Sequence, residues 1–194
     1  MLEKVTRIYG HQDTQRSMEA FRLSPDGKWM TLIAGGGSVN ILDAASGQWV
    51  AAAKVEGDVA DVSWWHNGAG ISIASARGEV WEYDVGARSF TGRWRDEGGV
   101  STTTIANGGA RWVAVGSLSG IVNVYDRKAS FGVGVGAAGT ASDPKPVKVL
   151  EQLITLVSVL AFSPDAQVLC IASRAKRDAL RMGTDPCTPS HCPR

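Results

Sequence analysis

The stretch AFRLSPDGKWMTLIAGGGSVNILD, residues 20–43, places a Ser-Pro-Asp-Gly turn between two apolar runs and closes on an Asp. A second stretch with the same plan, LAFSPDAQVLCIAS, stands at residues 160–173. A pattern that recurs within one chain is tested for a structural repeat before any other motif is interpreted, because a missed repeat changes the whole fold assignment.

The chain does repeat, and three segments end alike: GSVNILD at 37–43, GEVWEYD at 78–84 and GIVNVYD at 120–126. In each segment a Gly stands six residues before the closing Asp, and the closing Asp residues follow one another at intervals of 41 and 42 residues. Further upstream, four units carry a turn residue at what we interpret as the same place: Asp26, Asn67, Asn107 and Asp165.

Each unit therefore reads as strand, turn, strand, turn, strand and a weaker fourth strand. Asp-Gly, Asn-Gly and Arg-Gly at the bends supply the positive φ that tight hairpins need. Four strands in about 40 residues are typical of a WD40 propeller blade. The sequence predicts an all-β fold, an incomplete WD40-type β-propeller of about three and a half four-stranded blades.

The repeat also divides the chain, and the insertion is placed in the third unit because the step from Asn107 to Asp165 is longer than the others. We expect a lead-in strand or loop at 1–18, blades at 19–56, 57–97 and 98–150 with a flexible insertion at 130–146, a partial blade at 151–182 and a disordered tail at 183–194. The expected structural blade positions are Asp26, Gly37, Asp43, Asn67, Gly78, Asp84, Asn107, Gly120, Asp126 and Asp165.

The match to the repeat is degenerate. No unit ends in Trp-Asp, since the closing pairs are Leu42-Asp43, Tyr83-Asp84 and Tyr125-Asp126, and the four units from residue 19 on lack the Gly-His dipeptide. The usual Asp-His-Ser/Thr-Trp hydrogen-bond network is therefore not expected. A large side chain before the Asp still predicts packing between blades.

Charge and cysteine usage limit the function classes. The 194 residues carry a net charge of +1, which is not the broad basic field of a protein that depends mainly on phosphate contacts. Charged residues near the start argue against a signal peptide, and no apolar run reaches the ~18 residues of a membrane helix. The three cysteines all follow residue 169, so no disulfide framework is expected and a reducing, intracellular compartment is favoured.

Two glycine motifs do not carry chemistry. GVGAAG at 134–139 matches the dinucleotide fingerprint, but the prolines that follow at 144 and 146 forbid the helix that the fingerprint needs. We expect a surface loop there and no cofactor. GSLSG at 116–120 has Leu118 where a nucleophile elbow needs Ser, so that reading fails.

No catalytic or metal site is expected. His11, His66 and His191 stand in three unrelated contexts, and His66 is placed on an exposed bend without a partner that would make it a general base. Cys187, His191 and Cys192 offer three ligands in a Pro-rich tail, where an unstructured terminus is preferred to a zinc site.

The sequence also contains two short charged stretches. Asp96-Glu97 lies on a connection between blades, and we interpret it as a solvated acidic loop. The basic cluster of Arg174, Lys176, Arg177 and Arg181 falls on the bend after the second strand of the fourth unit. Such a cluster is most often a solvated loop; because propellers bind through their loops, contact with RNA or an acidic partner is the alternative.

The connecting loops resemble one family. FTGRWRDEGGVSTTTIANGGARWVAVGSLSGIVNVYD at 90–126 and PKPVKVLEQLITLVSVLAFSPDAQVLCIASRAKRDALR at 144–181 are similar to corresponding blades of the U3 small nucleolar RNA-associated protein 18 family. The resemblance covers roughly residues 3–182, whereas residues 183–194 do not share it.

The resemblance implies a non-catalytic scaffold of the small-subunit processome, in the nucleus and nucleolus, that acts in 18S rRNA processing and ribosome biogenesis. It implies as partners other propeller and helical-repeat proteins, with U3 snoRNA and pre-rRNA in the same particle, and neither a membrane nor a small-molecule substrate. The alternative is a WD40 adaptor of another class, such as a ubiquitin-ligase substrate receptor or a signalling scaffold, which has no reason to share these loops.

Overall fold

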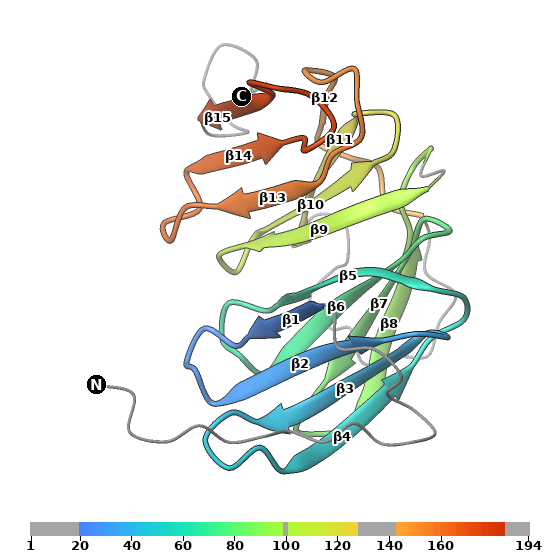
Figure 1. Ribbon diagram of the computed structural model, residues 1–194, viewed down its shortest axis with the longest axis vertical. Helices are drawn as coiled ribbons and strands as arrows, with labels where there is room; N and C mark the ends of the chain where they lie inside the picture. The colour runs from blue at the N-terminus through green and yellow to red at the C-terminus, as the bar shows by residue number, and fades with distance from the viewer. Residues whose placement is uncertain (1–19, 99–100, 128–142, 185–194) are drawn as a thin grey trace.

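The computed structural model describes residues 20–98, 101–127 and 143–184, which form four antiparallel sheets (Figure 1). Blade 1 contains β1 (Ala20–Leu23), β2 (Trp29–Ala34), β3 (Ser38–Asp43) and β4 (Trp49–Lys54). Blade 2 contains β5 (Val59–Trp64), β6 (Gly70–Ser75), β7 (Glu79–Asp84) and β8 (Ser89–Arg95). Blade 3 contains β9 (Thr102–Gly108), β10 (Trp112–Ser117), β11 (Val122–Asp126) and β12 (Lys148–Leu150), and blade 4 contains β13 (Val159–Phe162), β14 (Val168–Ala172) and β15 (Leu180–Thr184).

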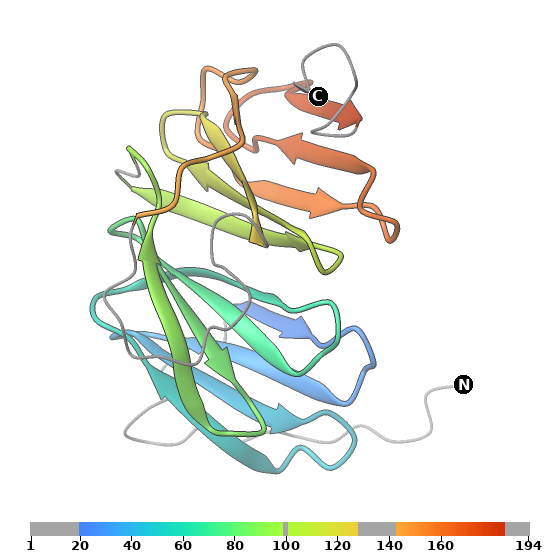
Figure 2. The ribbon, with the colours of Figure 1, turned by 180° about the vertical axis from the view of Figure 1, so that it is seen from behind.

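Strands within each blade pair in sequence order, so the predicted all-β propeller fold is confirmed. The first strands of successive blades lie beside one another, as β5 and β9 do where blades 2 and 3 meet (Figures 1 and 2). The part of the chain that the structure describes holds no helix long and apolar enough to cross a membrane.

The fourth blade differs from the prediction. The sequence predicts about half a blade at 151–182, but a third strand is present, because β15 pairs with β14 from Val168↔Thr184 to Ala172↔Leu180. Gly183 and Thr184, assigned to the tail by sequence, form the end of this strand. The strand lacks the Gly and closing Asp that mark the third strand of the other units, so the repeat pattern could not reveal it.

In the third blade the fourth strand follows the insertion. β12 pairs with β11 through Val122↔Leu150, Asn123↔Val149 and Val124↔Lys148. Most of the expected insertion at 130–146, the lead-in at 1–18 and most of the tail at 183–194 lie outside the described residues.

Apolar side chains fill the space between successive blades. Val39, Ile41, Val62, Ile71 and Ile73 are fully buried members of the cluster between blades 1 and 2. A second cluster, with Val80, Trp94, Ile105, Val113 and Tyr125, lies between blades 2 and 3. A third cluster joins blades 3 and 4 through Ala114, Val122, Val157, Leu160 and Ile171. Each blade is thus hydrophobic on the faces that meet its neighbours.

The two Ser-Pro-Asp turns have the same internal hydrogen bonds. Asp26 Oδ1 accepts from Ser24 Oγ (2.5 Å) and from the Lys28 N–H (3.1 Å), while the Ser24 hydroxyl oxygen accepts from the Trp29 N–H (2.8 Å). Asp165 and Ser163 repeat these contacts with Gln167 and Val168. Hydrogen bonds from the serine hydroxyls lower the pKa of both Asp26 and Asp165. The repeated motif is therefore a self-bonded turn between the first and second strands.

The Gly that recurs before the third strand is required for two reasons. A larger side chain would not fit there, and the backbone has a positive φ. Gly37 has φ +81°, and a Cβ placed on it would lie 2.3 Å from the Val55 carbonyl oxygen and 2.5 Å from that of Gly57. Gly120, with φ +90°, would place a Cβ 2.3 Å from the Leu153 carbonyl oxygen. At both positions the connection to the next blade passes directly over the glycine.

Gly37→Ala is expected to destabilise the fold much more than Gly36→Ala. Both glycines have positive φ, +71° at Gly36 and +81° at Gly37, so both alanines carry the ~1–3 kcal/mol of backbone strain. Only Gly37 has backbone atoms within 4 Å of the added Cβ, which must displace the Val55 connection. Urea unfolding of the two variants should therefore separate them by at least ~2 kcal/mol; equal losses would show that the contact is not restrictive.

Candidate functional site: buried polar contacts between the blades

Asp61, on the first strand of blade 2, connects three blades through one carboxylate. Its Oδ1 accepts from Arg22 Nη2 of blade 1 (2.7 Å) and from the neighbouring Val62 N–H (2.8 Å). Its Oδ2 accepts from Thr104 Oγ1 (2.7 Å) and the Ile105 N–H (3.4 Å) of blade 3. Asp61 is 5% exposed, so these contacts compensate the burial of its charge.

Local strand geometry aims this carboxylate at blade 3. The register of β5 against β6 shifts between Val59 and Asp61, which is a β-bulge. Beyond it, Asp61 and Ser63 point to the same side because side chains alternate along a strand. Both contact β9, whereas Val62 and Trp64 pack in the apolar cluster with blade 1.

Asn107 provides a second link between blades 2 and 3. Its backbone N–H donates to Ser63 Oγ (2.9 Å), and its Nδ2 donates to the carbonyl oxygens of Ser63 (3.1 Å) and Trp64 (3.2 Å). The prediction that Asn107 is a turn residue is wrong, since it lies in β9 and pairs with Val113. The turn begins later, at Gly109 with φ +56°, and the Asn side chain bonds the neighbouring blade instead.

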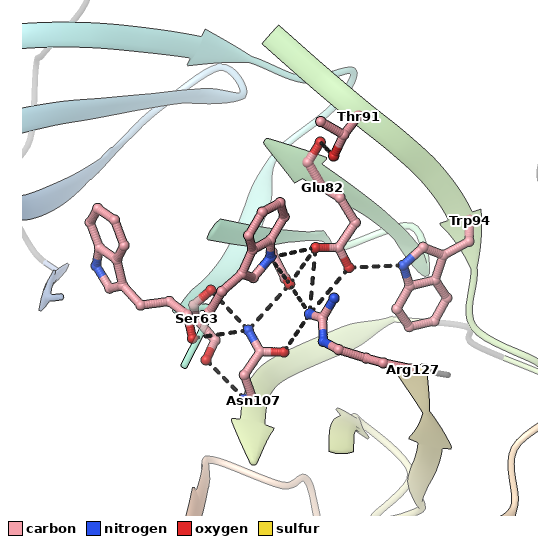
Figure 3. A network of polar contacts seen from close by, with 9 residues as sticks. Ser63, Glu82, Thr91, Trp94, Asn107 and Arg127 are labelled. Carbon is pink, nitrogen blue, oxygen red and sulfur yellow. Dashed lines mark hydrogen bonds and ion pairs between the residues drawn. The ribbon is translucent and has the colours of Figure 1, made fainter. Parts of the chain in front are cut away.

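A carboxylate with two indole donors lies in the interior of blade 2. Glu82, 5% exposed, accepts hydrogen bonds from Ser72 Oγ (2.7 Å), Trp65 Nε1 (2.8 Å) and Trp94 Nε1 (3.2 Å). Figure 3 shows the Glu82 side chain directed toward Trp94 and Arg127. Because every donor comes from the fold itself, the carboxylate serves as an internal acceptor.

Arg127, directly after β11, extends this network to blade 3. Its Nη2 donates to Ser72 Oγ (2.7 Å) and to Asn107 Oδ1 (2.7 Å) and lies 3.5 Å from the Glu82 carboxylate (Figure 3). The usual Asp-His-Ser/Thr-Trp network is not expected from the sequence, and the described residues form this different one. Arg127 and Glu82 were missed because neither stands at a repeated motif position.

Asp96 is a buried residue, not part of the solvated loop that the sequence predicted. It is 2% exposed and accepts hydrogen bonds from the Tyr125 hydroxyl and from Asn123 Nδ2 (2.9 Å). Asn123 Nδ2 also donates to the Glu97 carbonyl (2.8 Å), while the Glu97 N–H donates to the Tyr125 oxygen (2.9 Å). Glu97 itself is exposed. The Asp-Glu connection is therefore fixed to the third strand of blade 3.

Burial dominates the electrostatics of this contact. Desolvation raises the pKa of Asp96, although the hydrogen bonds from Tyr125 and Asn123 oppose the shift. The same burial, with the Asp96 charge nearby, raises the pKa of the Tyr125 phenol well above its usual range.

The closing Asp residues mostly bond their own turns. Asp43 Oδ1 accepts from the N–H groups of Ala45 (3.1 Å) and Ser46 (2.7 Å), and Asp84 Oδ1 accepts from the Ala87 N–H (2.7 Å). Asp126 Oδ2 instead accepts from Arg111 Nε (2.7 Å).

His66, Asn67 and Gly78 lie on turns between the strands of blade 2. Asn67 Oδ1 accepts from the Ala69 N–H (3.0 Å), Gly78 has φ +86°, and His66 is exposed on the turn between β5 and β6. His11, His191, Cys187 and Cys192 lie outside the described residues. Within residues 20–98, 101–127 and 143–184, no group of three or more His, Cys, Asp or Glu side chains could hold a metal ion.

The basic cluster is divided between two elements. Arg174, Lys176 and Arg177 are exposed on the bend between β14 and β15. The sequence predicts Arg181 on the bend, and this is wrong. Arg181 lies in β15, because that strand begins at Leu180. Its Nη1 donates back to the carbonyl oxygens of Leu180 (2.9 Å) and Asp178 (3.4 Å). All four cations therefore remain at one end of blade 4.

Asp61→Ala is expected to lower the free energy of unfolding by ~2–4 kcal/mol. The change leaves the buried Thr104 hydroxyl and nearby N–H groups without their acceptor, at ~1–3 kcal/mol for each unsatisfied group. Asp58→Ala, which removes an exposed carboxylate just before the same strand, is the matched control and should change stability by less than ~0.5 kcal/mol. Denaturant unfolding measures both, and similar effects would refute the role assigned to Asp61.

Asp96→Asn should change how stability depends on pH. Because the pKa of Asp96 is raised in the fold, its favourable contribution is complete below the ordinary aspartate value of 3.8 and is lost as pH rises through the raised pKa. The stability of the unsubstituted protein minus that of the variant should therefore fall across this window. Denaturant midpoints at a series of pH values test this, and a difference that is flat or rises with pH contradicts it.

No family model matches the chain. Several known proteins are nevertheless similar to it in sequence. It is 38% identical over 182 residues to the probable U3 small nucleolar RNA-associated protein 18 of Schizosaccharomyces pombe, which covers 93% of this chain and 34% of that protein. The Saccharomyces cerevisiae protein of that name is 40% identical, with the same coverages, and the human homolog is 30% identical over 87% of this chain and 29% of its own length.

A solved structure supports the fold alone. A chain in the crystal structure of the mitotic checkpoint complex matches with a TM-score of 0.65 and 18% identity, over 84% of this chain and 47% of that one. The chain spans about a third of the length of the curated relatives it matches, 34% of each of the two yeast proteins. With 38–40% identity over 93% of its length, the chain is a WD40-type propeller segment homologous to the U3 small nucleolar RNA-associated protein 18 family, as its loops implied.

Proposed function

We propose that this chain acts as a non-catalytic scaffold segment of the U3 snoRNP, within the small-subunit processome that carries out early 18S rRNA processing. One observation carries the proposal: relatives named as U3 small nucleolar RNA-associated proteins align with 93% of the chain at 38–40% identity. The alignment includes the connecting loops, which differ more among propellers than the blade strands do.

The internal contacts are consistent with a scaffold. Three buried carboxylates, those of Asp61, Glu82 and Asp96, are bonded by donors from the fold. A general base or nucleophile must be able to reach a substrate, whereas these groups bond neighbouring strands. They stabilise the blades and leave the loops as the binding surfaces.

The proposed setting follows from the same relatives. We place the protein in the nucleolus, with other propeller and helical-repeat proteins as direct neighbours and with U3 snoRNA and pre-rRNA in the same particle. A rigid propeller suits this role because it presents loops at fixed positions to several partners at once.

The tagged protein, expressed in its own cells, is expected to concentrate in nucleoli and to co-purify with U3 RNA and pre-rRNA. Sequencing of the co-purified RNA and fluorescence microscopy measure the two outcomes. Cytoplasmic localisation together with no enrichment of either RNA would overturn the proposal.

His66→Ala is expected to leave 18S maturation unchanged. His66 is exposed on the turn between β5 and β6. Northern analysis of rRNA precursors in cells that carry the variant tests this. A large loss of maturation with normal levels of folded protein would instead indicate a reactive or binding role for this histidine.

A further inference from the structure

The bend between β14 and β15 carries three exposed positive side chains close together in the sequence. Arg174, Lys176 and Arg177 are exposed, and within the described part of the chain none of them contacts a carboxylate. Elsewhere, arginines on or beside the strands do have carboxylate partners: Arg22, Arg93, Arg95, Arg111 and Arg127. The bend thus brings together three cations that have no ion pair among the described residues.

The backbone of this bend is held in place. The Ser173 N–H donates to the Ala179 carbonyl (3.0 Å), the Arg174 N–H donates to Ser158 Oγ (3.0 Å), and the Ala175 N–H donates to Ser173 Oγ (3.3 Å). Thr155 Oγ1 also donates to Ser173 Oγ (3.0 Å). A binding segment that is ordered beforehand loses less entropy when it meets a ligand.

Arg181 adds to the charge at this end. Its guanidinium donates to the Asp178 and Leu180 carbonyls, so it lies against the bend although its Cα belongs to β15. Residues 174–181 thus carry four cations and one carboxylate, that of Asp178, so this segment is positive although the chain carries only +1 overall. This is a confined positive patch, suited to a few contacts.

The composition of the bend favours phosphate groups as the ligand. Between Ser173 and Asp178 the only uncharged side chain is that of Ala175, so the bend lacks the aromatic and apolar residues that form the centre of a protein interface. It also lacks aromatic rings on which bases could stack. Contact with a nucleic acid would therefore run through the backbone, without reading its sequence.

We propose that the bend Arg174–Arg177 binds the phosphate backbone of single-stranded RNA. This inference rests on the proposed function, since an RNA-containing particle supplies the ligand. It adds to that function the place on the propeller where RNA is contacted and the chemistry of the contact.

The test compares two triple variants of the full chain. Arg174→Gln/Lys176→Gln/Arg177→Gln removes the bend charges, and Lys54→Gln/Arg77→Gln/Arg88→Gln removes three exposed charges from blades 1 and 2 as the matched control. Affinity for a fluorescent oligouridine is measured by anisotropy across ~50–200 mM salt. Equal thermal unfolding of all three proteins confirms that the changes leave the fold intact.

Each phosphate contact with a single strand contributes about 0.7 to the slope of log affinity against log salt. The bend variant should therefore lose about 2 units of slope and more than ~10-fold in affinity at the lowest salt, with the control close to the unsubstituted protein. Equal losses in both variants would overturn the proposal, because they would report total charge alone. Unchanged oligouridine affinity, with loss of a protein partner of the particle, would overturn it in favour of an acidic protein ligand.

The two proposals fail separately. If the unsubstituted protein does not bind oligouridine but still co-purifies with U3 RNA, the assignment of the bend is wrong and the scaffold function stands. If oligouridine binding depends on the bend but U3 RNA does not co-purify, the phosphate site stands and the assignment to the U3 particle fails.

Discussion

The carboxylate of Asp61 connects blades 1, 2 and 3, although each of the four sheets is a separate hydrogen-bonded ladder. Separate ladders must be joined by side chains, and apolar packing alone would allow neighbouring sheets to slide, because hydrophobic burial is not directional. A buried carboxylate with donors on both sides fixes the relative position of the first strands, since a displaced donor leaves a desolvated charge unsatisfied.

Each interface between blades has its own polar link. At the first, Trp64 Nε1 donates to the Arg22 carbonyl (3.2 Å), which reinforces the ion pair with Asp61. The second contains Asn107 and Arg127, and at its edge Asp96 is bonded to Tyr125. At the third, Thr103 Oγ1 donates to the Val157 carbonyl (2.6 Å). Hydrogen bonds of this kind restrict movement between the blades and so hold the loops at fixed positions.

The sequence predicted the repeat well, but it did not reveal the polar links between the blades. Turn glycines and the Ser-Pro-Asp motif are set by contacts within one unit or with its connection to the next, so they recur with the period of the blade and reveal the fold. Asp61 and Asn107 bond residues that are more than 40 positions away, and their chemistry depends on which face a strand presents after a bulge. Asp96 could not be recognised as buried because its burial comes from Tyr125 and Asn123 of the following unit. The third strand of blade 4 was missed because it keeps the pairing but lacks the motif.

We infer that these polar links make consecutive blades open together. Native-state hydrogen exchange can show this coupling, because exchange reports the free energy at which each segment opens. The backbone amides of β3, β7 and β10, from the middle of blades 1, 2 and 3, should exchange with the same free energy and the same dependence on denaturant. If β3 opened at a distinctly lower free energy while β7 and β10 stayed protected, the blades would be independent units that the polar links do not couple.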